Sequence, residues 1–207
     1  MMFRFFIKPV MTFAVMVGII VFDSCENKSS KSTKQNKSNI ENPIAQLKAV
    51  DVQAFRDAAL NGQLEKIMTM IPVMTNIDAP DESGHTALML AAYNGHTEIV
   101  RQLLDKGASV NLLDMEGRTA LLYASTGAFP ETVTLLLKRG AKLDIVDNGE
   151  HFTALMFAAA EGHLDVVKVL MAQGADPSLE DVDGDTAASF ARKNGHNDVA
   201  DFITNFK

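Results

Sequence analysis

The feature that most constrains the fold of this chain is a repeat with a period of 33 or 34 residues. Four Thr-Ala pairs mark this period, and their threonines lie 33, 34 and 33 residues apart: Thr86, Thr119, Thr153 and Thr186. Two series of glycines follow the same period: Gly62, Gly95, Gly162 and Gly195, and Gly107, Gly140 and Gly174. Because three series share one period, the sequence predicts a row of similar units rather than a single closed globule.

Within one unit, the residue types predict two short helices. Thr86 is a good N-cap for the first helix, and Gly84 before it permits the positive φ of a tight turn. Gly95 ends this helix and lets the chain reverse direction. The second helix, which Gly107 terminates, carries one apolar stripe: Ile99, Val100, Leu103 and Leu104. Neither helix has a core of its own, so a unit is stable only when it stacks on its neighbours.

This pattern resembles the ankyrin repeat, a unit of about 33 residues that contains a β-turn and two helices. The resemblance covers residues 48–207, and residues 81–111, DESGHTALMLAAYNGHTEIVRQLLDKGASVN, match the family pattern very closely. It implies an all-α repeat solenoid of stacked helix-turn-helix units with β-turn fingers. It also implies that histidines at the start of the second helix hydrogen-bond backbone and tie units together: His96, His163 and His196.

We expect five units, and the two outer ones depart from the pattern as end caps do. They are residues 48–80 (unit 1), 81–113 (unit 2), 114–146 (unit 3), 147–180 (unit 4) and 181–207 (unit 5). In units 2, 4 and 5 a Gly-His pair precedes the second helix: Gly95-His96, Gly162-His163 and Gly195-His196. In unit 3, Ala128 and Phe129 occupy these Gly-His positions, and Pro130 begins the second helix. The unit-4 finger, from Asp147 to Thr153, is one residue longer than the unit-3 finger. Insertions in repeat arrays often lie on the binding face, and neutral loop drift is an alternative explanation.

Residues 1–24 are typical of an export signal. Two basic residues precede the apolar run Val10–Phe22, which is too short to span a hydrocarbon core of about 30 Å. The run is followed closely by Cys25, the only cysteine of the chain, so the segment resembles a bacterial lipoprotein signal that is cleaved before Cys25. The resemblance implies that Cys25 carries the lipid. Asp23 departs from the usual lipobox, so an ordinary signal peptide or an uncleaved anchor stays open.

Residues 25–47 are expected to form a flexible basic tether. Residues 26–42 have a net charge of +2 and one apolar residue, which is too few to bury a core. The lysines of this segment either favour an anionic lipid surface or provide solubility and spacing. Residues 43–207 have a net charge of −10, which argues against nucleic-acid binding. This acidic body predicts a partner with a basic surface and an association that weakens with salt.

Residues that form catalytic or metal sites are sparse. A single cysteine rules out a thiolate-rich zinc site, and His85 and His151 are expected to be exposed contact residues in fingers. The acidic segment 180–185 resembles part of a calcium loop, but Arg192 stands where that loop needs a bidentate Glu. We therefore expect no enzyme, no cofactor and no metal, with a metal-dependent enzyme as the alternative. Three methionines are expected to pack in core stripes: Met68, Met156 and Met171.

The resemblance implies a protein-binding module. Together with the signal it predicts a monomeric, lipid-anchored protein that faces the periplasm of a bacterial envelope. There it would act as a scaffold, a chaperone or an inhibitor or immunity partner of another envelope protein, with a passive spacer as an alternative. The family binds through a concave strip of finger tips and first helices. Mapped onto this sequence, the strip comprises Glu82, Ser83, His85, Tyr93, Asn94, Met115, Glu116, Arg118, Ser125, Thr126, Glu150, His151, Phe152, Glu161, Asp183, Asp185 and Lys193.

Overall fold

The computed structural model describes residues 43–206, with side chains described from residue 52. Residues 1–42 and Lys207 lie outside the described residues, and with them the predicted signal, Cys25 and most of the predicted tether. The described part contains ten α-helices, one 3-10 helix and no strand, so the predicted all-α repeat fold is confirmed. The elements are α1 (Pro43–Leu60), α2 (Leu64–Met70), η1 (Ile71–Val73), α3 (Ala87–Tyr93), α4 (Thr97–Asp105), α5 (Ala120–Ser125), α6 (Pro130–Lys138), α7 (Ala154–Ala160), α8 (Leu164–Ala172), α9 (Ala187–Lys193) and α10 (Asn197–Asn205).

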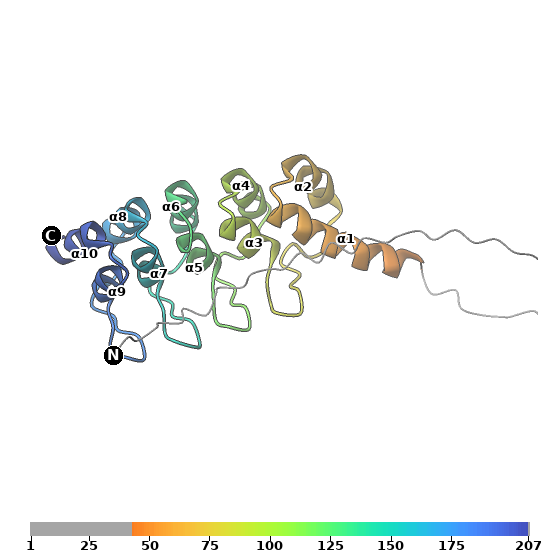
Figure 1. Cartoon of the computed structure of the whole chain (residues 1–207). Coiled ribbons are helices and arrows are strands. Elements are labelled where there is room, and N and C mark those ends of the chain that lie inside the picture. The colour runs from red at the N-terminus through yellow and green to blue at the C-terminus, as the bar shows by residue number, and fades with distance from the viewer. Residues whose placement is uncertain (1–42, 207) are drawn as a thin grey trace, which may run out of the picture. The chain divides into compact units, whose positions relative to one another are not determined.

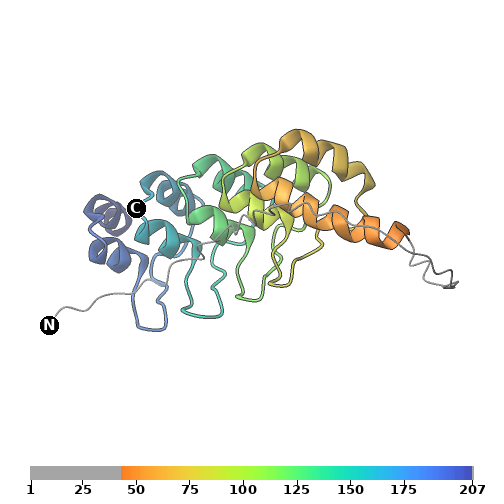
Figure 2. The same cartoon turned by 45° about the vertical axis from the view of Figure 1, so that its right-hand side comes forward.

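The helices form five pairs that stand side by side in two rows (Figure 1). The inner row consists of α1, α3, α5, α7 and α9, and each of these helices packs on the next. The outer row consists of α2, α4, α6, α8 and α10. Long loops join one pair to the next and project beyond the inner row as fingers (Figures 1 and 2). The finger tips are residues 81–86 in unit 2, 114–119 in unit 3, 147–153 in unit 4 and 181–186 in unit 5.

A threonine caps each inner helix from α3 onward. The hydroxyl oxygen of Thr86 accepts a hydrogen bond from the backbone N–H of Met89 at 3.3 Å. Equivalent bonds cap α5, α7 and α9, with Thr119, Thr153 and Thr186 as the acceptors. In unit 2 the sulfur of Met89 in turn accepts the N–H of Thr86 at 3.5 Å. The two bonds together make a reciprocal cap at the start of α3.

The apolar core lies between the two rows and between neighbouring units. Ala91 and Ala92 of α3 are fully buried, and their small side chains let the inner helices approach closely. From the outer row, Val100 and Leu103 are also fully buried. Each buried side chain of this size contributes about 1.5–3 kcal/mol, but only while the neighbouring unit is in place.

The methionines do not all take their expected places. Met156 and Met171 are buried, as predicted. Met68 is 45% exposed, so its predicted place in the core is wrong. The side chain of α2 that fills the core is its neighbour Ile67, because consecutive residues of a helix point to different sides.

Residues at the Gly-His positions connect one unit to the next. The Nε2 atom of His96 lies 3.0 Å from the carbonyl oxygen of Leu60, and that of His163 lies 3.2 Å from the carbonyl oxygen of Thr126. A carbonyl only accepts, so Nε2 carries the proton in both. These two bonds match the role that the family resemblance implies. Phe129 cannot make such a bond, and its ring packs against Gly95 instead.

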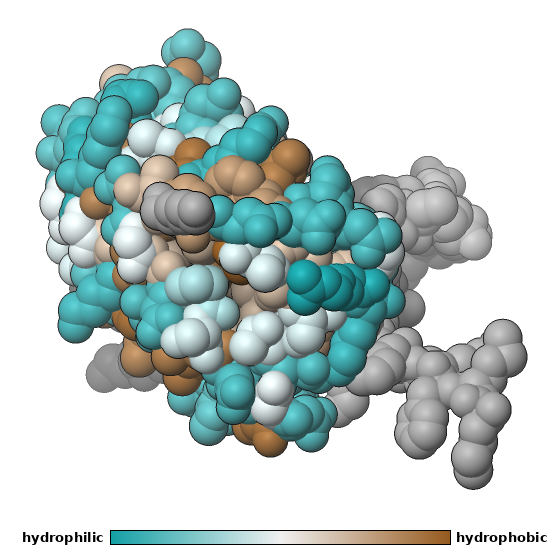
Figure 3. All heavy atoms as spheres, turned by 90° about the vertical axis from the view of Figure 1, so that its left-hand side faces the viewer, coloured by the Kyte–Doolittle hydropathy of each residue, from teal (hydrophilic) through white to brown (hydrophobic). Residues whose placement is uncertain are grey.

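The two ends of the stack differ from its middle. Helix α1 begins at Pro43 rather than near residue 48, so the last part of the expected tether is helical. Proline is tolerated in the first turn because no helical carbonyl needs its N–H there. At the other end, Arg192 and Lys193 are exposed, and hydrophilic side chains cover much of this end (Figure 3).

Two glycine substitutions separate backbone strain from packing. Gly95 and Gly140 have φ values of 67° and 86°, but a Cβ at Gly95 would lie 2.2 Å from the ring of Phe129, whereas a Cβ at Gly140 meets nothing within 4 Å. We expect Gly140→Ala to lower the free energy of unfolding by about 1–2 kcal/mol. Gly95→Ala should lower it by a further ~1–3 kcal/mol through overpacking. Urea unfolding measures both free energies. Equal losses of stability in the two variants would contradict the close contact between Gly95 and the ring of Phe129.

Candidate functional site

An aspartate builds the turn at each finger. One carboxylate oxygen of Asp114 accepts the backbone N–H groups of Glu116 and Arg118, both at 2.8 Å. Asp81 and Asp181 bind two N–H groups in the same way. These carboxylates hold the backbone in a tight turn, so they are structural groups rather than free ligands.

Backbone hydrogen bonds join the fingers into one row. The N–H of Met115 donates to the carbonyl of Ser83 at 3.0 Å. The backbone N–H of Asn148 donates to the backbone carbonyl of Glu116 at 2.8 Å. The backbone N–H of Val182 donates to the backbone carbonyl of Glu150 at 3.1 Å. Each finger therefore sets the position of the next one.

The longer unit-4 finger stays within this row. His151 has a φ of 61°, a left-handed conformation that the fingers of units 2, 3 and 5 give to a glycine. The additional residue is accommodated at the tip, while Glu150 still accepts the bond that continues the row. The insertion therefore changes the side chains at the tip and leaves the order of the fingers intact.

A buried polar network joins the fingers of units 2 and 3. The Nδ1 atom of His85 lies 2.9 Å from a carboxylate oxygen of Asp81, and its Nε2 atom lies 3.7 Å from Asp114. His85 is only 6% exposed, so the expectation that it is an exposed contact residue is wrong. Burial by itself raises the pKa of Asp81, but the hydrogen bonds from His85 and Ser83 bring that pKa below its usual value.

Tyr123 completes this network from α5. Its hydroxyl group donates to the second carboxylate oxygen of Asp114 at 2.6 Å. Burial raises the pKa of Tyr123 well above its usual value of about 10, and the negative charge of Asp114 raises it further. The rings of His85 and Tyr93 each form a T-shaped pair with the ring of Tyr123, at centroid distances of 5.8 and 6.0 Å.

Arg118 already has partners within the protein. Its guanidinium pairs with Glu116, lies 3.5 Å from Asp147 and stands over the ring of Phe157. The side chain is 22% exposed, and its Nε atom is buried without a hydrogen-bond partner among the residues that the structure describes. Arg118 is thus held in place before any partner binds.

An aromatic line continues from this point towards unit 5. The ring of Phe152 meets Phe157 at a centroid distance of 5.3 Å and Phe190 at 4.8 Å. Lys193 stands over Phe190 and forms an ion pair with Asp185. The hydrogen bond from Lys193 lowers the pKa of Asp185. Phe152 is consequently half-buried rather than a free aromatic anchor.

The predicted strip residues fall into three groups by exposure. Nine are exposed: Glu82, Asn94, Met115, Glu116, Glu150, His151, Glu161, Asp183 and Lys193. Six are half-buried: Ser83, Tyr93, Arg118, Thr126, Phe152 and Asp185. His85 and Ser125 are buried, and Ser125 uses its hydroxyl to donate to the carbonyl of Leu121 at 2.8 Å. Including these two as contact residues was therefore wrong.

Three exposed apolar residues of the fingers escaped the sequence reasoning: Leu112, Leu113 and Val146. Leu113 and Val146 directly precede the turn aspartates of their fingers. For Leu113 and Val146 the signal is their place directly before a buried turn aspartate, because side chains of an extended segment alternate between two sides. Leu112 lies two residues before Asp114, so this alternation does not predict its exposure.

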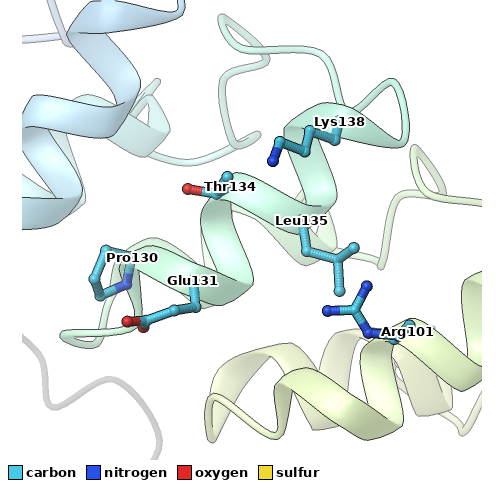
Figure 4. Close-up of a pocket in the computed structure, with 6 residues that line it drawn as sticks. All are labelled: Arg101, Pro130, Glu131, Thr134, Leu135 and Lys138. Carbon is cyan, nitrogen blue, oxygen red and sulfur yellow. The ribbon is translucent and has the colours of Figure 1, made fainter.

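Neither a metal site nor a catalytic cleft is evident in residues 43–206. Within that range, no group of three or more His, Cys, Asp or Glu residues is placed to hold a metal ion. Asp181 binds two backbone N–H groups and Asp185 pairs with Lys193, which argues against the calcium alternative. A pocket of about 320 Å³ between α4 and α6 is lined by Arg101, Pro130, Glu131, Thr134, Leu135 and Lys138 (Figure 4). No hydrogen bond there joins the Thr134 hydroxyl to a base that would activate it.

The repeat units match a family model described as ankyrin repeats (3 copies), over residues 55–147 and 130–206. The chain is an ankyrin-repeat protein. Ankyrin repeats generally bind proteins and are not catalytic, so the described domain is a protein-binding module.

Two curated ankyrin-region relatives are ubiquitin ligases by name. The probable E3 ubiquitin-protein ligase XBOS33 of Oryza sativa subsp. japonica is 42% identical over 53 residues, which are 26% of this chain and 10% of that protein. The E3 ubiquitin-protein ligase hecd-1 of Caenorhabditis elegans is 43% identical over 58 residues, which are 27% of this chain and 2% of that protein. The matched share is small, so this similarity assigns no ligase activity to the ankyrin protein. Among its described helices, none is long and apolar enough to cross a membrane.

The buried hydroxyl of Tyr123 gives the ankyrin domain a distinct response to alkali. Because the folded pKa lies above the unfolded value, the stabilisation is complete below about pH 10 and is lost as the pH rises further. We expect Tyr123→Phe to remove this part of the loss and to lower stability at neutral pH by about 1–3 kcal/mol, since Asp114 loses a donor. Urea unfolding from pH 8 to 11 measures both effects.

Tyr93→Phe is the matched control, because the Tyr93 hydroxyl forms no hydrogen bond within residues 52–206. The control should keep the wild-type loss of stability above pH 10. An unchanged alkaline response in Tyr123→Phe would show that the buried hydroxyl does not produce it.

Proposed function

We propose that the exposed part of the predicted strip binds a protein partner through a basic surface. The observation that carries this proposal is a set of carboxylates without partners. Within residues 52–206, four exposed acidic side chains form no hydrogen bond or ion pair: Glu82, Glu150, Glu161 and Asp183. The cations beside them, Arg118 and Lys193, are paired. The strip therefore presents uncompensated negative charge, which attracts a basic surface and speeds association at low salt.

Apolar contact in this proposal comes from Tyr93 and Met115. Tyr93 is half-buried and its hydroxyl has no partner among residues 52–206, while Met115 is 74% exposed. Tyrosine is enriched at interface hot spots because its ring buries apolar area and its hydroxyl still donates. Arg118 and Phe152, two further residues of the predicted strip, are already packed within the domain and contribute shape more than new contacts.

Charge reversal tests this assignment. In the triple variant Glu82→Lys, Glu150→Lys and Asp183→Lys, we expect capture of partners from a bacterial envelope extract by the full chain to fall at least about tenfold, because attraction becomes repulsion. Quantitative mass spectrometry of the captured proteins measures the loss. In the wild type, capture should also weaken when the salt concentration is raised.

The matched control is Glu65→Lys, Glu131→Lys and Asp201→Lys, which changes the charge equally on the outer helices α2, α6 and α10. These three carboxylates are exposed and unpaired within the described range as well. If both variants keep the wild-type set of partners, the passive spacer becomes the better description. Stoichiometric metal in the purified protein would instead favour the metal-dependent enzyme.

We further propose that this module is exported and held at the periplasmic side of a bacterial membrane by a lipid on Cys25. The proposal rests on the apolar run, the single cysteine and the basic polar segment that follows it. Two or three acyl chains on one residue anchor a protein stably, whereas a single chain does not. An anchored binding surface of this kind would serve a scaffold, a chaperone or an inhibitor or immunity partner of another envelope protein.

Lipidation has a direct test. In a bacterial host that is fed radiolabelled palmitate, we expect the wild-type chain to carry label and to sediment with membranes. Cys25→Ser removes the acylated thiol, so the label should be lost and the signal should stay uncleaved. Cleavage of the wild-type chain without label would support an ordinary signal peptide, and an unprocessed, unlabelled wild-type chain in the membrane would support an uncleaved anchor.

A further inference from the structure

The longer unit-4 finger leaves part of its backbone without hydrogen bonds. In units 2, 3 and 5 the turn aspartate accepts two backbone N–H groups with its carboxylate and a third, from the finger glycine, with its carbonyl. In unit 4, Asp147 accepts a single backbone N–H, that of Phe152, at 3.0 Å. Within residues 43–206, the N–H groups of Gly149, Glu150 and His151 donate no hydrogen bond. The additional residue thus leaves three consecutive amides unbonded at this tip.

The first of these amides directly follows an asparagine. Asn148 and Gly149 are both exposed, and a Cβ on Gly149 would meet no atom within 4 Å. Asparagine is chemically labile because the backbone nitrogen of the next residue can attack its Cγ atom. The attack is easiest when that next residue is glycine, which has no side chain to hinder the rotation. The unit-4 tip therefore combines a labile pair with an open, unbonded backbone.

The chain contains three other Asn-Gly pairs, and the folded structure restrains each of them: Asn61-Gly62, Asn94-Gly95 and Asn194-Gly195. The Nδ2 atom of Asn94 donates to the carbonyl of Leu60 at 2.7 Å, which holds the side-chain amide against the preceding unit. The N–H of Gly95 donates to the carbonyl of Ala92 at 3.1 Å. Both the attacking nitrogen and the attacked amide of this pair are thus held by hydrogen bonds.

The other two pairs are restrained in similar ways. The Nδ2 atom of Asn194 donates to the carbonyl of Ala160 at 2.7 Å, and the N–H of Gly195 is bonded to the carbonyl of Arg192. The Nδ2 atom of Asn61 donates to the carbonyl of Asp57 at 2.7 Å. Its neighbour Gly62 is covered by the imidazole ring of His96, since a Cβ there would lie 2.6 Å from that ring.

Asn148 is held more loosely than these three asparagines. Its Nδ2 atom donates to the carbonyl of Met115 at 3.4 Å, a longer and weaker hydrogen bond than those at 2.7 Å. Neither a hydrogen bond of the Gly149 N–H nor a packed side chain opposes rotation about the following peptide in the described part of the chain. Reacting groups that are free to approach each other react faster than groups held apart.

We propose that Asn148 is a site of spontaneous deamidation, in which the backbone nitrogen of Gly149 displaces the side-chain amide. A bond forms between the nitrogen of Gly149 and the Cγ atom of Asn148, and the bond between Cγ and Nδ2 breaks. The proton of the Gly149 N–H leaves with Nδ2 as ammonia, and a cyclic imide remains. Water then opens the imide without any change of oxidation state. Addition at Cγ gives aspartate, and addition at the backbone carbonyl carbon gives isoaspartate.

Either product changes the unit-4 finger. A carboxylate replaces a neutral amide, so the tip gains one negative charge. The hydrogen bond to the carbonyl of Met115 is lost, because an ionised carboxylate only accepts. Isoaspartate in addition lengthens the backbone by one carbon atom in front of Gly149. The finger therefore changes its charge and shape with the age of the protein, whether or not a partner is present.

Peptide mapping by mass spectrometry tests the site in the purified full chain after incubation at mildly alkaline pH. We expect deamidation at Asn148 to be at least about tenfold faster than at Asn94 and Asn194, whose amides are held away from the attacking nitrogen. Chromatography should separate an aspartate and an isoaspartate product at residue 148. In water enriched in heavy oxygen, each product should carry one labelled oxygen atom. In a chain unfolded by urea, the four Asn-Gly pairs should react at similar rates.

A substitution in the pair identifies the attacking nitrogen. Gly149 has no left-handed φ and its Cβ position is open, so Gly149→Ala should fold as the wild type does. We expect this variant to slow deamidation of Asn148 at least about tenfold, because the added methyl group hinders the approach of the nitrogen. The matched control is Glu150→Ala, which changes the next exposed residue of the same tip and should keep the wild-type rate.

Four outcomes would overturn the proposal: an unreactive Asn148, equal rates at Asn148 and Asn94 in the folded chain, aspartate without isoaspartate at residue 148, or an unchanged rate in Gly149→Ala. The third outcome would indicate direct hydrolysis of the side chain by water, and the fourth would exclude the nitrogen of Gly149 as the attacking group. None of these measurements involves a partner, so they leave the proposed function untouched.

Discussion

The structure depends on apolar burial that is shared between units. No helical pair encloses its own core: the alanines of α3 are covered by α1 on one side and α5 on the other. This requirement explains the sequence period, because every unit must present the same two complementary faces. It also explains why the end units differ, since each has one face without a neighbour. The polar side chains Arg192 and Lys193 at the end of α9 fit this condition.

A second constraint fixes the fingers, which have little core of their own. Their turns are held by buried aspartates, and a single backbone bond passes from each finger to the next. The structural carboxylates are therefore directed inward. The carboxylates that remain for a partner are those at the tips and at the end of α7, such as Glu150 and Glu161. The negative charge of the domain thus has two separate roles, one in shaping the loops and one at the surface.

Features that depend on local backbone geometry could be predicted from the sequence, whereas contacts between side chains of different units could not. The caps at Thr86 and Thr119 and the helix-ending Gly95 depend on local backbone geometry, so the sequence period located them. The burial of His85 depends on two aspartates in different fingers, and a repeat pattern does not show where neighbouring side chains meet. Ser125 was misassigned because its side chain is fully buried and donates back to the carbonyl of Leu121 in its own helix.

The same reasoning bears on the two sides of the finger row. Asp114 is buried because its carboxylate holds the turn and accepts the hydroxyl of Tyr123. Its neighbours Leu113 and Met115 have no such role and are 54% and 74% exposed. Nothing in the turn requires those two neighbours to be apolar, since Glu180 and Glu82 fill the equivalent places in other fingers. The exposed apolar residues of the middle fingers are thus not explained by the turns that they flank, whereas the buried aspartates are.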